Sequence, residues 1–279
     1  MGMVAFFIFG GLTIMANTEQ QETDILEKKD KKWSLKVSGS GNIRYLIIDN
    51  DGGPGSNGTW DYINDTHSWC NGKGTWDEPF VIENVTIRGD LSSRHGITIR
   101  DSTKPFIIRN CSIHNMGTGG EYDGAIKLNN TKNGIITKNN CSRNNASGIV
   151  LYRSHNNTVE KNNLFDNDVH RNDLNGALRG LYVFQSHNNT ITWNNASDNY
   201  YGIRVYNSED NTISHNNVSK NDNAGIYCLI GRSNNIRNNF LSENEYYGIT
   251  LSGIKYSKVF NNTIKENRTG IQIIHVRHH

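Results

Sequence analysis

The 279-residue chain is poor in the residues from which most globular cores are built. Hydrophobic residues make up 35% of it, and it has only three prolines. That share is low for a globular protein, so the thin core of a repeat protein is favoured over a compact sandwich. No segment shows apolar residues at helical spacing over ten residues, which argues against a helical domain.

A strongly basic surface is also missing. The formal net charge is +2 with both signs interspersed, and the main basic run, Lys28–Lys32, is interrupted by Asp30. Nucleic-acid-binding domains concentrate Lys and Arg on one face. We therefore expect no nucleic-acid partner, and residues 19–36 are typical of a charged linker.

No apolar run is long enough to cross a bilayer, which takes about 20 residues. The longest, Met3–Met15, is thirteen residues and resembles the apolar part of a signal peptide, without the usual basic start. We expect residues 1–18 to be a signal peptide or a short membrane anchor, a buried strand being the third option. Both preferred options predict an extracellular, periplasmic or cell-surface protein, in contact with a membrane only through this segment.

Cysteines are few, and none has the CxxC spacing of zinc or iron–sulfur sites. Export would permit disulfides. Cys111 and Cys141 fall at nearly equivalent positions of adjacent repeats, which is compatible with a bridge or with two stacked thiols. The pairing of Cys70, Cys111, Cys141 and Cys228 stays open.

What the chain does have is an internal repeat. Glycines at 180, 202, 225, 248 and 270 are 22 or 23 residues apart, and insertions at Met116–Asp123 and Asp168–Leu178 explain two longer gaps. Such regularity over most of the chain indicates a solenoid. The aligned segments are GITIRDSTKPFIIRNCSIHN (96–115), AIKLNNTKNGIITKNNCSRN (125–144), GIVLYRSHNNTVEKNNLFDN (148–167), GLYVFQSHNNTITWNNASDN (180–199), GIRVYNSEDNTISHNNVSKN (202–221), GIYCLIGRSNNIRNNFLSEN (225–244) and GITLSGIKYSKVFNNTIKEN (248–267).

Apolar and polar residues alternate within each repeat, which predicts short half-buried strands. A repeat of this length is too short for a strand–helix unit but fits three strands and three turns. We therefore predict an all-β, right-handed, single-stranded parallel β-helix over residues 80–279, with an incomplete last coil and a cap at 37–79. The two predicted core columns are Ile97, Ile126, Ile149, Leu181, Ile203, Ile226, Ile249 and Ile107, Ile136, Val159, Ile191, Ile213, Ile236, Val259.

Asparagine is the most conspicuous excess. Its amide both donates and accepts hydrogen bonds, and its backbone tolerates left-handed turns, so stacked asparagines can bond coil to coil. We interpret them as scaffold. The two predicted ladders are Asn110, Asn139, Asn162, Asn194, Asn216, Asn239, Asn262 and Asn115, Asn144, Asn167, Asn199, Asn221, Asn244, Asn267.

The coil pattern G-I-x-[ILV]-x-x-S-x-N-N-x-I-x-x-N-x-x-x-x-N resembles the NosD-like, pectin-lyase-like β-helix family over about residues 80–279. The resemblance implies carbohydrate-binding or sugar-hydrolase repeats. The family also contains polysaccharide lyases, epimerases and a copper-maturation accessory protein. These motifs are core and corner residues, so they specify the fold far more strongly than the activity.

A functional site must use outward positions. Beside the core isoleucines, aromatic residues recur at the coil period, and an arginine joins them. Such a ribbon can stack sugar rings, although aromatic residues also stabilise strands by stacking across rungs. The candidate ligand-binding residues are Tyr152, Tyr182, Phe184, Arg204, Tyr206 and Tyr227. We expect a polysaccharide partner, with a structural spacer as the further alternative.

Catalysis and metal binding have thinner support. Glycoside cleavage needs paired carboxylates and a lyase needs a base with cations. The insertions supply the candidates Asp123, Asp168, His170 and Asp173, and Arg179 follows the second insertion. Glu243 and Glu266 on adjacent rungs could share Ca²⁺. No other cofactor is expected. The last coil looks open in sequence, so further coils or a partner would seal it.

Overall fold

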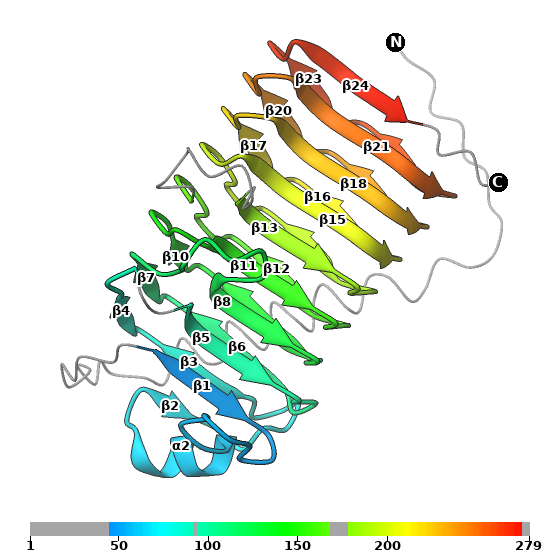
Figure 1. The fold of residues 1–279 in the computed structure, drawn as a ribbon. Coiled ribbons are helices and arrows are strands. Elements are labelled where there is room, and N and C mark those ends of the chain that lie inside the picture. The colour runs from blue at the N-terminus through cyan, green and yellow to red at the C-terminus, as the bar shows by residue number, and fades with distance from the viewer. Residues whose placement is uncertain (1–44, 92–93, 168–177, 275–279) are drawn as a thin grey trace, which may run out of the picture. The chain divides into compact units, whose positions relative to one another are not determined.

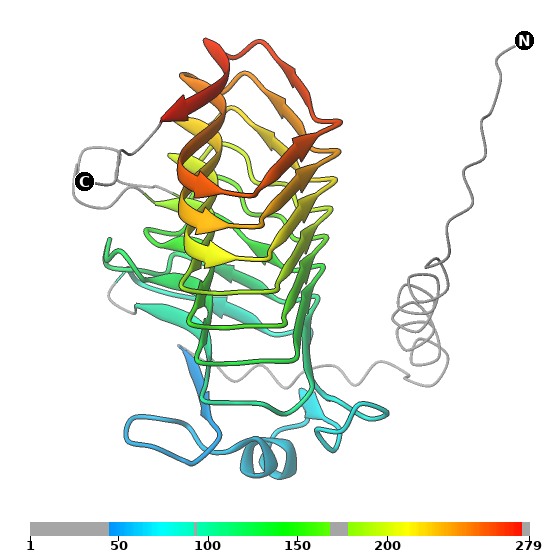
Figure 2. The ribbon, with the colours of Figure 1, turned by 90° about the vertical axis from the view of Figure 1, so that its right-hand side faces the viewer.

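The computed structural model describes residues 45–91, 94–167 and 178–274. These residues wind into coils that stack along one axis (Figures 1 and 2). Each coil adds one strand to each of two nine-stranded sheets, in which neighbours are successive coils. All strand pairs are parallel except β2–β3. The predicted right-handed parallel β-helix is confirmed.

Three sheets form the sides of the coil. Sheet A contains β1 (Leu46–Asp49), β5 (His95–Arg100), β8 (Gly124–Asn129), β11 (Ser147–Tyr152), β13 (Arg179–Phe184), β15 (Tyr201–Glu209), β18 (Ala224–Arg232), β21 (Tyr247–Lys255) and β24 (Thr269–Ile274). Sheet B contains β2 (Cys70–Asn71), β3 (Phe80–Glu83), β6 (Phe106–Arg109), β9 (Gly134–Thr137), β12 (Thr158–Glu160), β14 (Thr190–Thr192), β16 (Thr212–Ser214), β19 (Asn235–Arg237) and β22 (Lys258–Phe260).

The third side, sheet C, is built of two short pieces. Single-residue bridges through Asn163 and Asn195 connect them. The pieces are β4 (Thr86–Arg88), β7 (Ser112–His114), β10 (Asn140–Cys141), and β17 (Asn217–Ser219), β20 (Phe240–Ser242), β23 (Thr263–Lys265).

The first predicted core column is confirmed in full, because Ile97, Ile126, Ile149 and their successors pair in register on sheet A. The second is wrong in its first member. Ile108, not Ile107, pairs with Ile136, since the first coil has one extra residue between sheets A and B. Ile108 belongs to the continuous core.

The same shift corrects the start of both asparagine ladders. Cys111 and Met116 donate their backbone N–H to Asn139 and Asn144, so they occupy the first rungs. Asn110 and Asn115 instead have left-handed backbones, at φ 53° and 58°. From Asn139 and Asn144 onward, both predicted ladders continue rung by rung to Asn262 and Asn267.

A third asparagine ladder and a hydroxyl ladder escaped sequence reasoning. Asn157, Asn189, Asn211 and Asn234 bond in succession at the next corner. Thr131, Ser154, Ser186 and Ser208 do so where sheet A turns. Each buried amide satisfies donors and acceptors that would otherwise lie unpaired in the core, at a net gain of about 1 kcal/mol per hydrogen bond.

All four cysteines are free and buried. Cys141 pairs with Ile113, whereas Cys111 aligns with Asn139, so neither of the two alternatives, a bridge or two thiols stacked in one column, is found. The extra residue in the first coil causes this offset. Burial raises the pKa of Cys70, Cys111 and Cys228 to about 12, so these thiols stay protonated.

A short helix, α2 (Trp60–Thr66), packs near the start of the coils (Figure 1). Its Trp60 ring stacks on Phe80, with 5.0 Å between centroids, and its indole N–H donates to Ser102 Oγ at 2.9 Å. Within the described ranges no helix is long and apolar enough to cross a membrane. The predicted signal or anchor segment, residues 1–18, lies outside those ranges.

Candidate functional site

The outer face of sheet A carries most of the candidate ligand-binding residues. The strand register aligns Tyr152, Phe184 and Tyr206 on successive rungs. Beside them, Tyr182, Arg204 and Tyr227 form a second column. The two columns therefore lie side by side, as period-two alternation predicts.

The first insertion covers part of this face. Its Tyr122 ring lies 5.1 Å from Tyr152, 6.1 Å from Tyr182 and 5.0 Å from Phe184, measured between centroids. Tyr182 is fully buried and Phe184 is 9% exposed. The expectation of an exposed ribbon is therefore wrong for these two rings, which form a small second core under the insertion.

Arg179, a candidate catalytic residue, fastens that insertion. Its guanidinium donates to the carbonyl oxygen of Glu121 at 3.0 Å and lies 4.3 Å above the Tyr182 ring. The side chain is 2% exposed, and burial lowers its pKa to about 10. A cation this enclosed is placed to hold the loop rather than to reach a ligand.

Asp123, the other described catalytic candidate, is likewise engaged within the insertion. One carboxylate oxygen accepts hydrogen bonds from the Thr118 N–H, the Thr118 hydroxyl and the Gly120 N–H. These bonds shape the turn of the loop. Asp168, His170 and Asp173 lie outside the described residues.

The accessible part of this face is the arginine–tyrosine patch. It consists of Arg204 with Tyr201, Tyr206 and Tyr227, all half-buried. The guanidinium carbon of Arg204 lies 5.6 Å from the ring centroid of Tyr201 and 5.7 Å from those of Tyr206 and Tyr227. Burial raises the pKa of Tyr201 to about 12, so its hydroxyl keeps its proton. Arg204 Nε is buried and has no hydrogen-bond partner among the described residues, so only the outer guanidinium nitrogens can reach a ligand. Flat rings around a cation with spare donors suit hydroxyl-rich or anionic ligands.

Sequence reasoning missed a second polar pair on the same sheet. Lys127 shares the outward column of Arg204, and its Nζ lies 3.5 Å from Nε2 of His95. His95 Nδ1 accepts the Gly124 N–H at 3.2 Å. Because Nδ1 accepts, the proton of the neutral ring is on Nε2, and Lys127 can accept it only as an uncharged amine.

Burial disfavours the charged form of both groups. It lowers the pKa of His95 to about 4, with the nearby Lys127 charge acting in the same direction. Burial also lowers the pKa of Lys127, although Asp123 opposes the change. The sequence signal that could have found this pair is the outward position of Lys127 on the strand that follows the first insertion.

The metal candidates do not converge with other ligands. Glu243 and Glu266 are both exposed, and Glu243 lies 4.0 Å from Lys220 Nζ. In the described part of the chain, no group of three His, Cys, Asp or Glu residues could hold a metal ion. Calcium sharing by the two glutamates stays a prediction.

Comparison with known proteins gives a family and a fold. A family model described as right handed beta helix region matches residues 37–241 and 167–278. No curated protein matches the chain. All the similarities to solved structures described below are under 20% identical and therefore bear on the fold alone.

Among solved structures, the Dettilon tailspike protein is 18% identical with a TM-score of 0.57, over 65% of this chain and 39% of that one. A double mutant of the periplasmic alginate epimerase AlgG is 14% identical with a TM-score of 0.52, over 71% and 50%. The A-module of the Azotobacter vinelandii mannuronan C-5 epimerase AlgE4 is 17% identical with a TM-score of 0.49, over 75% and 68%. The chain spans about half the length of the AlgG chains that it matches.

Proposed function

Because this chain belongs to the right-handed β-helix family, we propose that it is a carbohydrate-binding protein that uses the outer face of sheet A. One of the structurally similar proteins, AlgG, is by name an alginate epimerase, which makes a glycan partner plausible. The observation that carries the proposal is the arginine–tyrosine patch. Four tyrosine rings, including Tyr182, surround Arg204 at 5.3–5.7 Å.

Sugar rings present apolar C–H faces and hydroxyl edges, so they need both a ring to stack on and donors at its border. Tyr201, Tyr206 and Tyr227 supply the rings on neighbouring rungs, and Arg204 supplies the donors. Rungs repeat about every 4.8 Å, so a polymer lying along the coil axis would meet equivalent positions repeatedly. Tyr152 extends the same face at the edge of the insertion.

Binding to a glycan array and to immobilised polysaccharides tests this function. We expect Tyr206→Ala with Tyr227→Ala to weaken binding at least tenfold, because both stacking surfaces are removed. The matched control is Trp193→Ala with Phe240→Ala, which removes two exposed aromatic residues outside sheet A, 58% and 39% exposed. Equal binding by the patch variant and the wild type would remove the patch from the site.

Arg204→Lys provides a finer test. Lysine keeps the charge but loses the planar fork that can bind two ligand oxygens at once. We expect this variant to bind more weakly while its thermal unfolding temperature stays close to that of the wild type. A variant that binds normally would assign Arg204 to the structure of the patch alone.

A sugar-modifying activity is the second candidate, and the His95–Lys127 pair favours it. An uncharged amine can act as a base, and elimination or epimerisation of a uronate begins with removal of the proton next to its carboxylate. In this proposal the uncharged Lys127 amine releases its hydrogen bond from His95 Nε2–H and accepts that proton on its one lone pair. Release of unsaturated uronate, or exchange of the C5 hydrogen in D₂O, would be lost in Lys127→Gln. No turnover on any acidic glycan would exclude the activity.

The location of the protein is part of the proposal. We infer export to the periplasm, the cell surface or the medium, with residues 1–18 as the signal or anchor and residues 37–79 as the cap of the coils. Cell fractionation checks the location, and mass spectrometry of the mature N-terminus checks whether residues 1–18 are removed. Recovery of the intact chain in the cytoplasm would contradict this inference.

A further inference from the structure

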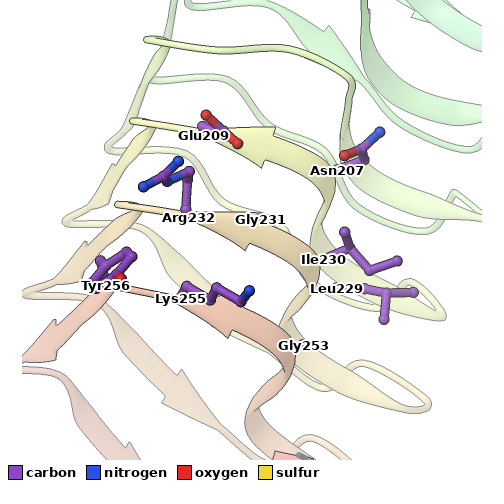
Figure 3. Close-up of a pocket in the computed structure, with 9 residues that line it drawn as sticks. All are labelled: Asn207, Glu209, Leu229, Ile230, Gly231, Arg232, Gly253, Lys255 and Tyr256. Atoms are coloured by element: carbon purple, nitrogen blue, oxygen red, sulfur yellow. The ribbon is translucent and has the colours of Figure 1, made fainter. Parts of the chain in front are cut away.

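A groove lies beside the patch, where sheet A bends. The three nine-residue strands β15, β18 and β21 turn at Asn207, Ile230 and Gly253, all with left-handed backbones. The groove encloses about 500 Å³ (Figure 3). It is lined by Asn207, Glu209, Leu229, Ile230, Gly231, Arg232, Gly253, Lys255 and Tyr256.

Three charged residues stand in one column past the bend. The register pairs Glu209 with Arg232 and Arg232 with Lys255, so one carboxylate and two cations occupy successive rungs (Figure 3). Within the described ranges, neither Arg232 nor Lys255 forms an ion pair with a carboxylate at 4.0 Å or less. Two cations about one rung apart, roughly 4.8 Å along the axis, thus have no described carboxylate within 4.0 Å, and Glu209 is the one acid among the described residues of their column.

An aromatic residue borders these cations. Tyr256 is 76% exposed, and the Arg232 guanidinium lies 5.5 Å from its ring centroid. This geometry leaves one edge of the guanidinium for a ligand while the ring offers a stacking surface. An arginine beside a tyrosine ring therefore occurs on both sides of the bend, here and in the arginine–tyrosine patch.

Two residues that line the groove have an unfavourable backbone conformation. Ile230 has φ 52° and Tyr256 has φ 53°, yet a β-branched residue is rarely found in the left-handed region. At the same corner of neighbouring rungs the chain has Asn207 and Gly253, which tolerate it. Ile230 is also 47% exposed, so its burial does not offset the strain. Left-handed residues occur at many corners of the described coils, but a β-branched residue there is strained, and such strain is often found at binding sites.

We propose that this groove binds an acidic polysaccharide, with uronate carboxylates on Arg232 and Lys255. Tyr256 stacks on a sugar ring, Glu209 accepts hydrogen bonds from sugar hydroxyls, and Leu229 and Ile230 form the apolar wall. The inference rests on the proposed function, because the groove lies on β15 and β18, the strands that also carry the patch. It adds the ligand class, an anionic glycan, and the direction of the chain along the coil axis.

Calorimetric titration of the full chain with uronate hexamers (mannuronate and galacturonate), with neutral cellohexaose and with inorganic phosphate tests the inference. We expect a hexauronate to bind with an affinity that falls as NaCl rises. Arg232→Gln with Lys255→Gln should weaken this binding at least tenfold and leave any cellohexaose binding unchanged. The matched control is Arg237→Gln with Lys258→Gln, which removes the same charges from sheet B of the same two coils and should stay within twofold of the wild type.

Undiminished hexauronate binding by the groove variant, or no hexauronate binding at all, overturns the inference. Phosphate binding as tight as hexauronate binding also overturns it, because the groove would then be a plain anion site. If no hexauronate binds while cellohexaose binds and depends on Tyr206 and Tyr227, the proposed function stands and this inference fails. If hexauronate binding depends on the groove but not on the patch, this inference stands and the patch is removed from the site.

Discussion

The ring of Tyr122 meets the ring of Phe184 edge to face, with 5.0 Å between their centroids. Tyr122 belongs to the first insertion, which precedes β8, whereas Phe184 lies on β13, two rungs further along sheet A. The insertion thus folds across the sheet instead of standing beside it. This contact separates the His95–Lys127 pair on one side from the arginine–tyrosine patch on the other.

Removing the Tyr122 ring should loosen that cover. We expect Tyr122→Ala to lower the free energy of unfolding by about 1–3 kcal/mol, because the ring is partly buried against three others. Binding of a hydrophobic dye should rise as Tyr182 and Phe184 become exposed. Tyr62→Ala, which alters a 56% exposed ring on α2, serves as control. Unchanged unfolding and dye binding would mean that the insertion is held by Arg179 alone.

The repeat predicted the fold well because each coil supplies its own evidence. Glycine spacing and period-two alternation located the core column of Ile97 and placed Tyr182 and Arg204 on the outer face. The alignment failed at Ile107, where two consecutive isoleucines fit the column equally and an extra turn residue shifts the register. Periodicity cannot detect such a shift when both neighbours are apolar.

The site was less predictable, since its exposure depends on contacts that no repeat encodes. Alternation states that the Phe184 ring points out of sheet A, but not that Tyr122 lies on top of it. His95 and Lys127 come from different coils, and only their register brings them within 3.5 Å. Long-range packing, not local pattern, decides which outward residues meet solvent.

The middle of an asparagine ladder should be intolerant of change. Asn194 is 1% exposed; its Oδ1 accepts from Asn162, and its Nδ2 donates to the Val159 carbonyl and to Asn216 Oδ1. Asn194→Ala leaves several buried groups unpaired, so we expect a loss of about 2–4 kcal/mol in unfolding free energy. Asn188→Gly, at an exposed left-handed corner of the same coil, should change it by under about 0.5 kcal/mol. If Asn194→Ala costs no more than Asn188→Gly, the buried ladder bonds contribute no net stability.

The strained corner of the groove makes an opposite prediction. Ile230→Asn should raise the unfolding free energy by about 1 kcal/mol, because asparagine adopts the left-handed conformation more readily. Gly253→Ala, on the next rung at φ 60°, should lower it by about as much. Urea unfolding measures both. If Ile230→Asn is destabilising, the apolar contacts of Ile230 outweigh its backbone strain, and the strain argument for the groove is lost.

The buried imidazole should make stability depend on acid. The pKa of His95 is about 4 in the folded chain, against 6.5 for a histidine exposed to water. The unfolded chain therefore binds the extra proton first as pH falls, and stability is lost between about pH 6.5 and pH 4, up to roughly 3 kcal/mol. Above pH 6.5 the residue contributes no pH dependence. His95→Asn keeps an acceptor for the Gly124 N–H but cannot titrate, so its unfolding free energy should fall less steeply over that range. Urea unfolding at half-unit pH steps compares the two slopes, and parallel curves would show that another group governs the acid response.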